Sequence, residues 1–134
     1  DAVVTASSGG ERAEGSRLAG DAWAPDEHDG MQWLQWALDG PHSILKVRTM
    51  GNRNPPGEPY DYYVTAYVLS HSMDGVTWEQ DPRSFRGNDD TEAVQENDVG
   101  VPRIRARFLR LHPTDWNADI IALRAELVGA RCRG

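Results

Sequence analysis

The chain has 134 residues, of which 39% are hydrophobic and 26% charged, and its formal net charge is −7 at pH 7. This length fits one domain with its own core, and we predict a single domain over residues 1–134. An acidic surface repels phosphate groups, which disfavours nucleic acid as a partner and broad electrostatic adhesion to anionic membranes. No uncharged apolar run is long enough to span a bilayer.

Apolar residues recur mostly with a period of two, and 13 glycines and 8 prolines interrupt the chain at short intervals. This pattern is typical of an all-β sandwich or barrel, because alternate side chains of a strand point to opposite faces. In chain order, the predicted strands cover residues 3–6, 33–38, 44–50, 63–70, 92–96, 104–111 and 120–128. Turns or polar loops are predicted at residues 7–15, 24–30, 39–41, 51–59, 73–75 and 85–90.

The chain has one cysteine, Cys132, which cannot form an internal disulfide. It is either a free thiol or the partner of a cysteine in a longer parent chain, and composition alone does not fix the compartment. The first residues do not read as a secretory signal, and the chain opens directly on a strand-like run. We therefore expect a processed or excised domain of a larger protein.

Seven short sequence blocks together cover nearly the whole chain. They are VTASS at 4–8, SRL with AWAP at 16–25, WLQWALDG at 33–40, YVTAY with SMDGVTW at 63–78, FRGNDD at 85–90, RFLRLHPTDWN at 107–117 and IALRAELVG at 121–129. In this order and spacing the blocks resemble the discoidin family, also called the coagulation factor V/VIII type C family. The resemblance implies an all-β, distorted jelly-roll sandwich or barrel of about eight strands, with ligand loops gathered at one end.

The resemblance also implies a secreted or cell-surface protein that binds glycans, phospholipid head groups, collagen or other proteins. Members of the family usually join an N-terminal cysteine to one at the end of the last strand. Here Cys132 is slightly displaced from that position, and the other cysteine is expected before Asp1.

Tryptophans stand in several of these blocks. We expect Trp23, Trp33, Trp78 and Trp116 to serve core or turn packing rather than to form a ligand platform. Trp36 replaces the β-branched residue that the family usually has, and by alternation it faces the core, where it would fill extra volume.

Arginines of the strand at residues 104–111 form a local basic spot. They are Arg103, Arg105, Arg107 and Arg110, and their alternation predicts that they lie along one solvated face. Arg110 and Arg124 also lie beside apolar residues, so we expect half-buried guanidinium groups satisfied by carbonyls or carboxylates, with Glu126 and Asp115 as possible partners.

Catalytic and metal motifs are scarce. The sequence has no nucleophile elbow and no phosphate-binding glycine loop, so we predict no catalytic residues and no enzymatic activity. No histidine pair has zinc-ligand spacing. Relatives in the family carry a structural calcium near the SRL–AW turn and the last strand, which implies Asp21 and Glu126 as its ligands here; no other cofactor is expected.

By the same alignment the ligand loops are residues 8–15, 24–31 and 51–62. Aromatic faces, amides, guanidinium groups and carboxylates are the groups that bind sugars. The predicted ligand-binding residues are Asp26, Glu27, His28, Asn52, Arg53, Asn54, Tyr60 and Tyr62. The same groups could grip a basic peptide or stand as ordinary polar loop residues. The first and third loops carry no large aliphatic side chain that could insert into a membrane.

We therefore predict a non-catalytic extracellular recognition and adhesion module that binds carbohydrate on a cell surface or matrix through loops at one end of the barrel. The alternatives are a module that binds a phospholipid head group or a protein, or an accessory targeting domain of a secreted enzyme.

Overall fold

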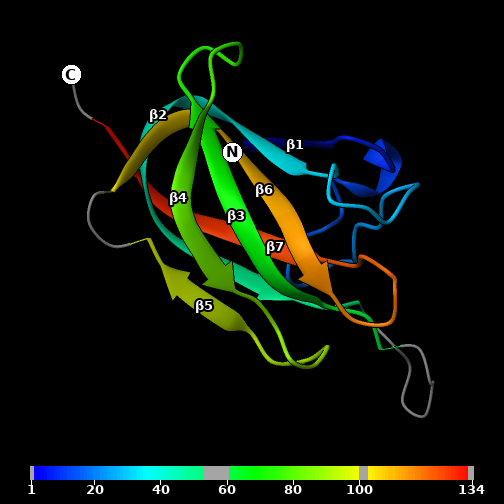
Figure 1. Ribbon diagram of the computed structural model, residues 1–134. Helices are drawn as coiled ribbons and strands as arrows, with labels where there is room; N and C mark the ends of the chain where they lie inside the picture. The colour runs from blue at the N-terminus through cyan, green and yellow to red at the C-terminus, as the bar shows by residue number, and fades with distance from the viewer. Residues whose placement is uncertain (1, 53–60, 100–102, 133–134) are drawn as a thin grey trace.

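The computed structural model describes residues 2–52, 61–99 and 103–132 and confirms the all-β prediction (Figure 1). The strands are β1 (Ala2–Ala6), β2 (Leu34–Met50), β3 (Val64–Ser72), β4 (Glu79–Arg86), β5 (Gln95–Asp98), β6 (Ile104–Trp116) and β7 (Arg124–Arg131). The helical content of these ranges is the short 3-10 turn η1 (Gly10–Arg12), so no helix within them could cross a membrane.

Strand β2 belongs to two layers at once. Its first half pairs antiparallel with β1 and β6, and its second half pairs antiparallel with β7 and β5. Beyond β6 the first layer continues through β3 to β4. Figure 1 shows β7 crossing behind β3 and β6, so the two layers enclose the core as a sandwich.

The predicted turn at residues 39–41 is wrong, because β2 runs through it. The pairing of β2 with β6 instead shifts register between Ala37 and His42. Irregularities of this kind tolerate proline, since the ladder is already interrupted there, and Pro41 lies at this point. The side chain of Asp39 pairs with Arg131 on β7.

Several other boundaries differ from the prediction: β5 covers residues 95–98 rather than 92–96, and β6 continues past residue 111 to Trp116. Residues 85–86, predicted in a turn, end the unpredicted strand β4, which pairs only with β3 and carries Pro82 as an edge strand can. The last strand begins at Arg124 rather than at residue 120, because residues 117–123 form a connection in which only Leu123 bridges to Trp23.

The core lies between the layers. Trp23 is fully buried, and Trp36 is 5% exposed and packs in the same cluster, which confirms that it faces inward. Leu109 and Leu111 of β6 meet Val47 of β2 in this cluster. Burying such side chains stabilises the fold by about 1.5–3 kcal/mol each.

Trp33 and Trp78 pack on the outer face of the first layer. The guanidinium carbon of Arg110 lies 4.1 Å from the ring centroid of Trp33 and 4.0 Å from that of Trp78. Its Nε donates to Oε1 of Gln35 at 2.8 Å, so the partner is a carbonyl oxygen, as expected, but that of a side-chain amide rather than Asp115 or Glu126. Burial between the rings lowers the pKa of Arg110.

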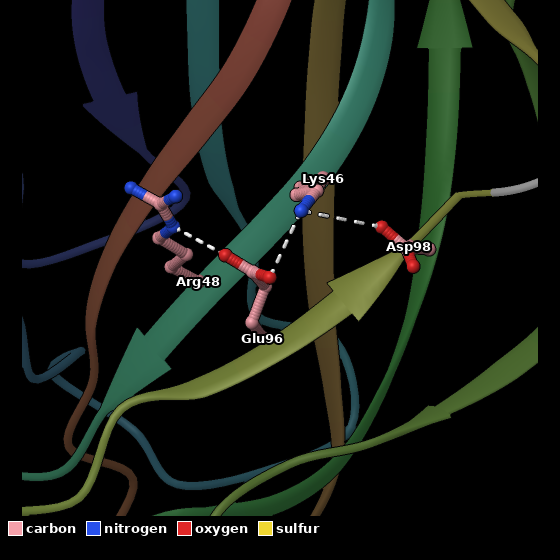
Figure 2. A network of polar contacts seen from close by, with 4 residues as sticks. All are labelled: Lys46, Arg48, Glu96 and Asp98. Atoms are coloured by element: carbon pink, nitrogen blue, oxygen red, sulfur yellow. Dashed lines mark hydrogen bonds and ion pairs between the residues drawn. The ribbon is translucent and has the colours of Figure 1, made fainter.

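The edge strand β5 is held to β2 by charges (Figure 2). Lys46 and Arg48 on β2 face Asp98 and Glu96 across the antiparallel pair. Glu96 accepts from Arg48 at 2.7 Å and from Lys46 at 3.1 Å, and Lys46 lies 3.8 Å from Asp98. These contacts, first with Arg48 and then with Lys46, hold the pKa of Glu96 below its usual range.

His112 on β6 is half-buried beside β3, and its Nε2 lies 2.6 Å from Oγ of Ser70. Burial lowers its pKa, and the charge of Arg110 lowers it further. The folded protein therefore favours the neutral ring.

We expect the free energy of unfolding to fall as pH drops below about 6.5, the ordinary pKa of histidine, because the unfolded chain then binds a proton that the folded chain refuses until a lower pH. Urea denaturation at several pH values between 4 and 8 measures this decline. In His112→Gln the decline should be shallower. An unchanged decline in that variant would show that another group takes up the proton.

Candidate functional site

Four connections gather at one end of the sandwich, on the right-hand side of Figure 1. They are residues 7–15, 24–31, 51–62 and 117–123, of which the third is described only at its ends. Hydrogen bonds link these connections to one another in a series.

The first connection is tied to the second mainly by Ser8. Its Oγ accepts from the backbone N–H of Asp26 at 2.9 Å, and its carbonyl accepts from Nε1 of Trp23 at 2.9 Å. Arg12 adds a bond from its guanidinium to the carbonyl of Ala24 at 2.8 Å. These bonds fix the two loops relative to the buried indole of Trp23.

The second connection is tied to the fourth by His28. Its Nδ1 accepts from the backbone N–H of Ile121 at 2.9 Å. A backbone N–H can only donate, so Nδ1 keeps its lone pair and the neutral ring carries its proton on Nε2. Nearby, Asp29 accepts from the side chain of Gln32 and the backbone of Met31, and these bonds lower its pKa.

The fourth connection is tied to the third by Asn117. Its Nδ2 donates to the carbonyl of Asp61 at 2.7 Å, and its Oδ1 accepts from the backbone N–H of Tyr63 at 2.8 Å. The next two residues, Ala118 and Asp119, adopt positive φ angles of 54° and 61°. Non-glycine residues rarely adopt this conformation, so surrounding contacts hold the turn in place.

Arg124, the first residue of β7 after the fourth connection, is buried and links that connection to the third and to two segments outside the four. Its Nε donates to the carbonyl of Gly51 at 2.7 Å, and its terminal nitrogens donate to the carbonyls of Leu18 at 2.9 Å and Thr91 at 3.0 Å. The expected satisfaction by backbone carbonyls is therefore right for this arginine.

The predicted ligand residues take different places in this arrangement. Asp26 and Glu27 are exposed, and His28 is half-buried against the fourth connection. Asn52 and Tyr62 close the base of the third loop, with Oδ1 of Asn52 accepting from the backbone N–H of Tyr62 at 3.0 Å. The remaining three predictions, Arg53, Asn54 and Tyr60, lie outside the described residues.

Sequence reasoning missed Asn117, which links the third predicted ligand loop to the fourth connection. It stands at the end of the block RFLRLHPTDWN, directly after strand β6. That position could have marked it, because polar residues that follow a strand often fix the next loop.

The calcium prediction gains no support from side chains. Asp21 is exposed, and Oε2 of Glu126 already accepts from the backbone N–H of Leu18 at 3.0 Å. Within the described ranges no three histidine, cysteine, aspartate or glutamate side chains gather as metal ligands do. A calcium ion takes six to eight oxygen ligands, so Asp21 and Glu126 would supply only part of its shell, and their role as calcium ligands stays a prediction.

Comparison with known sequences identifies the family. The sequence model of the F5/8 type C domain matches residues 3–127. The chain belongs to the F5/8 type C domain family. Neurexin-4 of Drosophila melanogaster is 36% identical over 137 residues, which cover 96% of this chain and 10% of that protein. Lactadherin of Bos taurus is 33% identical over 115 residues, which cover 81% of this chain and 26% of that protein. This F5/8 type C domain thus spans a quarter or less of the length of most such relatives.

Solved structures share the fold of this F5/8 type C domain. Discoidin II of Dictyostelium discoideum superposes with a TM-score of 0.83 at 22% identity, covering 99% of this chain and 56% of that one. Chitosan-binding module 2 from a chitosanase/glucanase of Paenibacillus sp. IK-5, solved in complex with chitotriose, superposes with a TM-score of 0.67 at 21% identity. The latter match covers 96% of each chain.

The substitution Gly9→Ala should push the first and second connections apart. Gly9 has a φ of 65°, and an added Cβ would lie 2.4 Å from the carbonyl oxygen of Ala24. We expect a loss of about 1–3 kcal/mol in the free energy of unfolding, measured by urea denaturation. The neighbouring Gly10→Ala is the control, because its added Cβ has nothing within 4 Å. Equal effects of the two substitutions would contradict the close approach.

Arg124→Gln should destabilise the domain by about 3 kcal/mol or more, because it leaves buried carbonyls without a donor. Chemical denaturation measures the loss. Arg86→Gln, at an exposed position on β4, should change stability by less than about 0.5 kcal/mol. Losses of similar size in both variants would show that Arg124 does not organise the loop roots.

Proposed function

We propose that this F5/8 type C domain is a non-catalytic recognition module that binds carbohydrate through the four connections at one end of the sandwich. The observation that carries the proposal is their serial hydrogen bonding through Ser8, His28 and Asn117. Loops held in this way lose little conformational entropy on binding, which favours a preformed site.

The groups on these loops suit hydroxyl-rich ligands. Asp26 and Glu27 are exposed carboxylates that can accept hydrogen bonds from sugar hydroxyls. With its Nδ1 occupied by Ile121, His28 keeps Nε2–H as a donor. The half-buried ring of Tyr62 stands at the root of the third loop, whose Arg53, Asn54 and Tyr60 remain predicted ligand residues.

The sugar-bound Paenibacillus module supports this proposal at the level of fold alone. A scaffold of the same architecture can present a carbohydrate site, and aromatic, amide and carboxylate groups are what such a site needs. No catalytic motif accompanies these groups in the sequence.

Binding of a phospholipid head group is the second candidate. Met31, in the second connection, is 79% exposed, and an apolar side chain at the tip of a loop can enter a lipid surface. Against this, one methionine buries little area at about 25 cal/mol per Å², and the net charge of −7 opposes an anionic membrane. Carbohydrate is therefore the favoured ligand.

We also propose that the domain works outside the cell as one module of a larger protein. Its relatives are several times longer than this chain, which fits a role in attaching a parent protein to a cell-surface or matrix glycan or protein. The parent protein could be a secreted enzyme, in which case this domain would be its accessory targeting domain. The sequence on either side of the domain in the parent protein would reveal this.

A glycan array run beside a liposome pull-down tests the ligand class. We expect array binding with little liposome retention, and about a tenfold loss of the association constant in Asp26→Asn/Glu27→Gln with an unchanged melting temperature. Asp89→Asn/Glu92→Gln, which alters two exposed acids between β4 and β5, is the charge-matched control. Arg53→Ala and Tyr60→Ala should weaken the same binding.

A silent array with strong retention on phosphatidylserine liposomes would replace carbohydrate by lipid as the ligand. Equal losses in the test and control variants would move the site away from the second connection.

A further inference from the structure

Strand β6 carries a row of arginines on the outside of the sandwich. Arg103, Arg105 and Arg107 are exposed, while Ile104 and Ala106 between them are buried. Three guanidinium groups therefore leave the same face, with roughly 6.6 Å of strand between successive residues. After a one-residue shift in the alternation, Arg110 continues the row in its aromatic cradle. We call these four residues the β6 arginine row.

The strand residues paired with two members of this row, Arg105 and Arg110, are uncharged. Arg105 pairs with Ser43 on β2, and Arg110 pairs with Gln35 on β2 and with Ser70 on β3. Opposite-charge pairs across strands are a common way to satisfy a cation on a sheet. Arg105 and Arg110 have no such acidic partner in the strand pairing, whereas Lys46 and Arg48 on β2 each have one.

The pairing of β2 with β5 shows the contrast within the same molecule. There Lys46 and Arg48 face Asp98 and Glu96, and both cations are ion-paired (Figure 2). Among the residues that the structure describes, no ion pair involves an arginine of the β6 arginine row. The row is a local excess of positive charge on a chain whose net charge is −7.

Three of the four guanidinium groups are oriented by their Nε atoms. Arg105 donates from Nε to Sγ of Cys132 at 3.3 Å, and Arg107 donates from Nε to the carbonyl of Leu38 at 3.3 Å. Arg110 uses Nε for Gln35 in the same way. In the described part of the chain, no residue is recorded as accepting from their terminal nitrogens. A guanidinium held at Nε presents its other edge for two parallel bonds to an oxyanion.

We propose that the β6 arginine row binds a linear polysaccharide bearing sulfate or carboxylate groups. Such a chain offers oxyanions in series, and the row offers guanidinium groups in series along one strand. A carboxylate is planar and a sulfate group is tetrahedral, and each offers two oxygens that one guanidinium can bind bidentately. The indoles of Trp33 and Trp78 hold Arg110 in place at one end of the row.

Nucleic acid and membranes are the alternative ligands for this surface. The excess of 21 acidic over 14 basic residues opposes every polyanion, so duplex DNA is compared directly with the polysaccharide in the test. An anionic lipid surface is opposed by the net charge of −7, and the aromatic rings beside the row (Trp33, Trp78 and Phe108) are packed against Arg107, Arg110 and one another.

The part of this surface formed by Arg103, Arg105 and Arg107 is separate from the proposed glycan site, whereas Arg110 packs on Trp33, which is hydrogen-bonded to Ser7 of the first connection. Residues 117–123 of that site follow the end of β6, whereas Arg103 to Arg107 lie at its beginning. The 13 residues of β6 extend over as much as roughly 40 Å. The two surfaces can therefore be tested, and can fail, independently.

The experiment uses heparin as the probe, by retention on immobilised heparin and by titration calorimetry at several salt concentrations. We expect the wild-type domain to bind, and Arg105→Gln/Arg107→Gln to lose about tenfold or more in the association constant. The slope of log K against log salt should become shallower by about one for each arginine removed that contacts the polyanion.

Arg17→Gln/Arg86→Gln is the matched control, because it removes two exposed arginines elsewhere on the chain. It should stay within about twofold of the wild type, and Asp26→Asn/Glu27→Gln should keep heparin binding intact. Circular dichroism and the melting temperature confirm that each variant folds.

Equal losses in the two arginine pairs would overturn the proposal, because the effect would then be one of total charge. Failure of the wild-type domain to bind heparin at physiological salt would also overturn it. The proposal would also be overturned if the domain bound duplex DNA or phosphatidylserine vesicles more tightly than heparin, and if that binding depended on Arg105 and Arg107.

Discussion

The loop end of this domain depends on one buried cation. Arg124 donates to the carbonyls of Leu18, Gly51 and Thr91, which come from three stretches of chain far apart in the sequence. Guanidinium is suited to this task because it remains charged and its donors lie in one rigid plane. Without it, the carbonyls at the roots of the loops would be buried without partners, and the loops would lose their common anchor.

Strand β2 joins the two layers of the sandwich. Because it pairs with β1 and β6 in its first half and with β7 and β5 in its second, one strand builds both layers. The register shift between Ala37 and His42 lets it change partners. The layers then carry the linked loops at one end and leave the beginning of β6 toward the other, where the arginine row lies.

The two surfaces use opposite chemistry on one acidic molecule. At the proposed glycan site, exposed carboxylates such as Asp26 and Glu27 are available to accept from sugar hydroxyls, and the excess of acidic residues does not repel a neutral ligand. Along β6, arginines without carboxylates across from them attract oxyanions despite the net charge of −7. A parent protein held by both surfaces would gain avidity, since the second contact becomes intramolecular.

The sequence by itself determined the all-β class, the family and the inward position of Trp36, because alternation and the ordered blocks are local properties of the chain. It also predicted that carbonyls could satisfy Arg124, but it could not say which ones, since Leu18 lies about a hundred positions away. Only the tertiary structure decided that β2 runs through residues 39–41 and that Pro82 stands in an edge strand. Local turn preferences point the other way there, and long-range pairing prevails. The tertiary structure likewise decided that Asn117 joins two connections, and that Arg105 and Arg110 pair with serines and a glutamine. Both facts depend on which distant segments fold side by side.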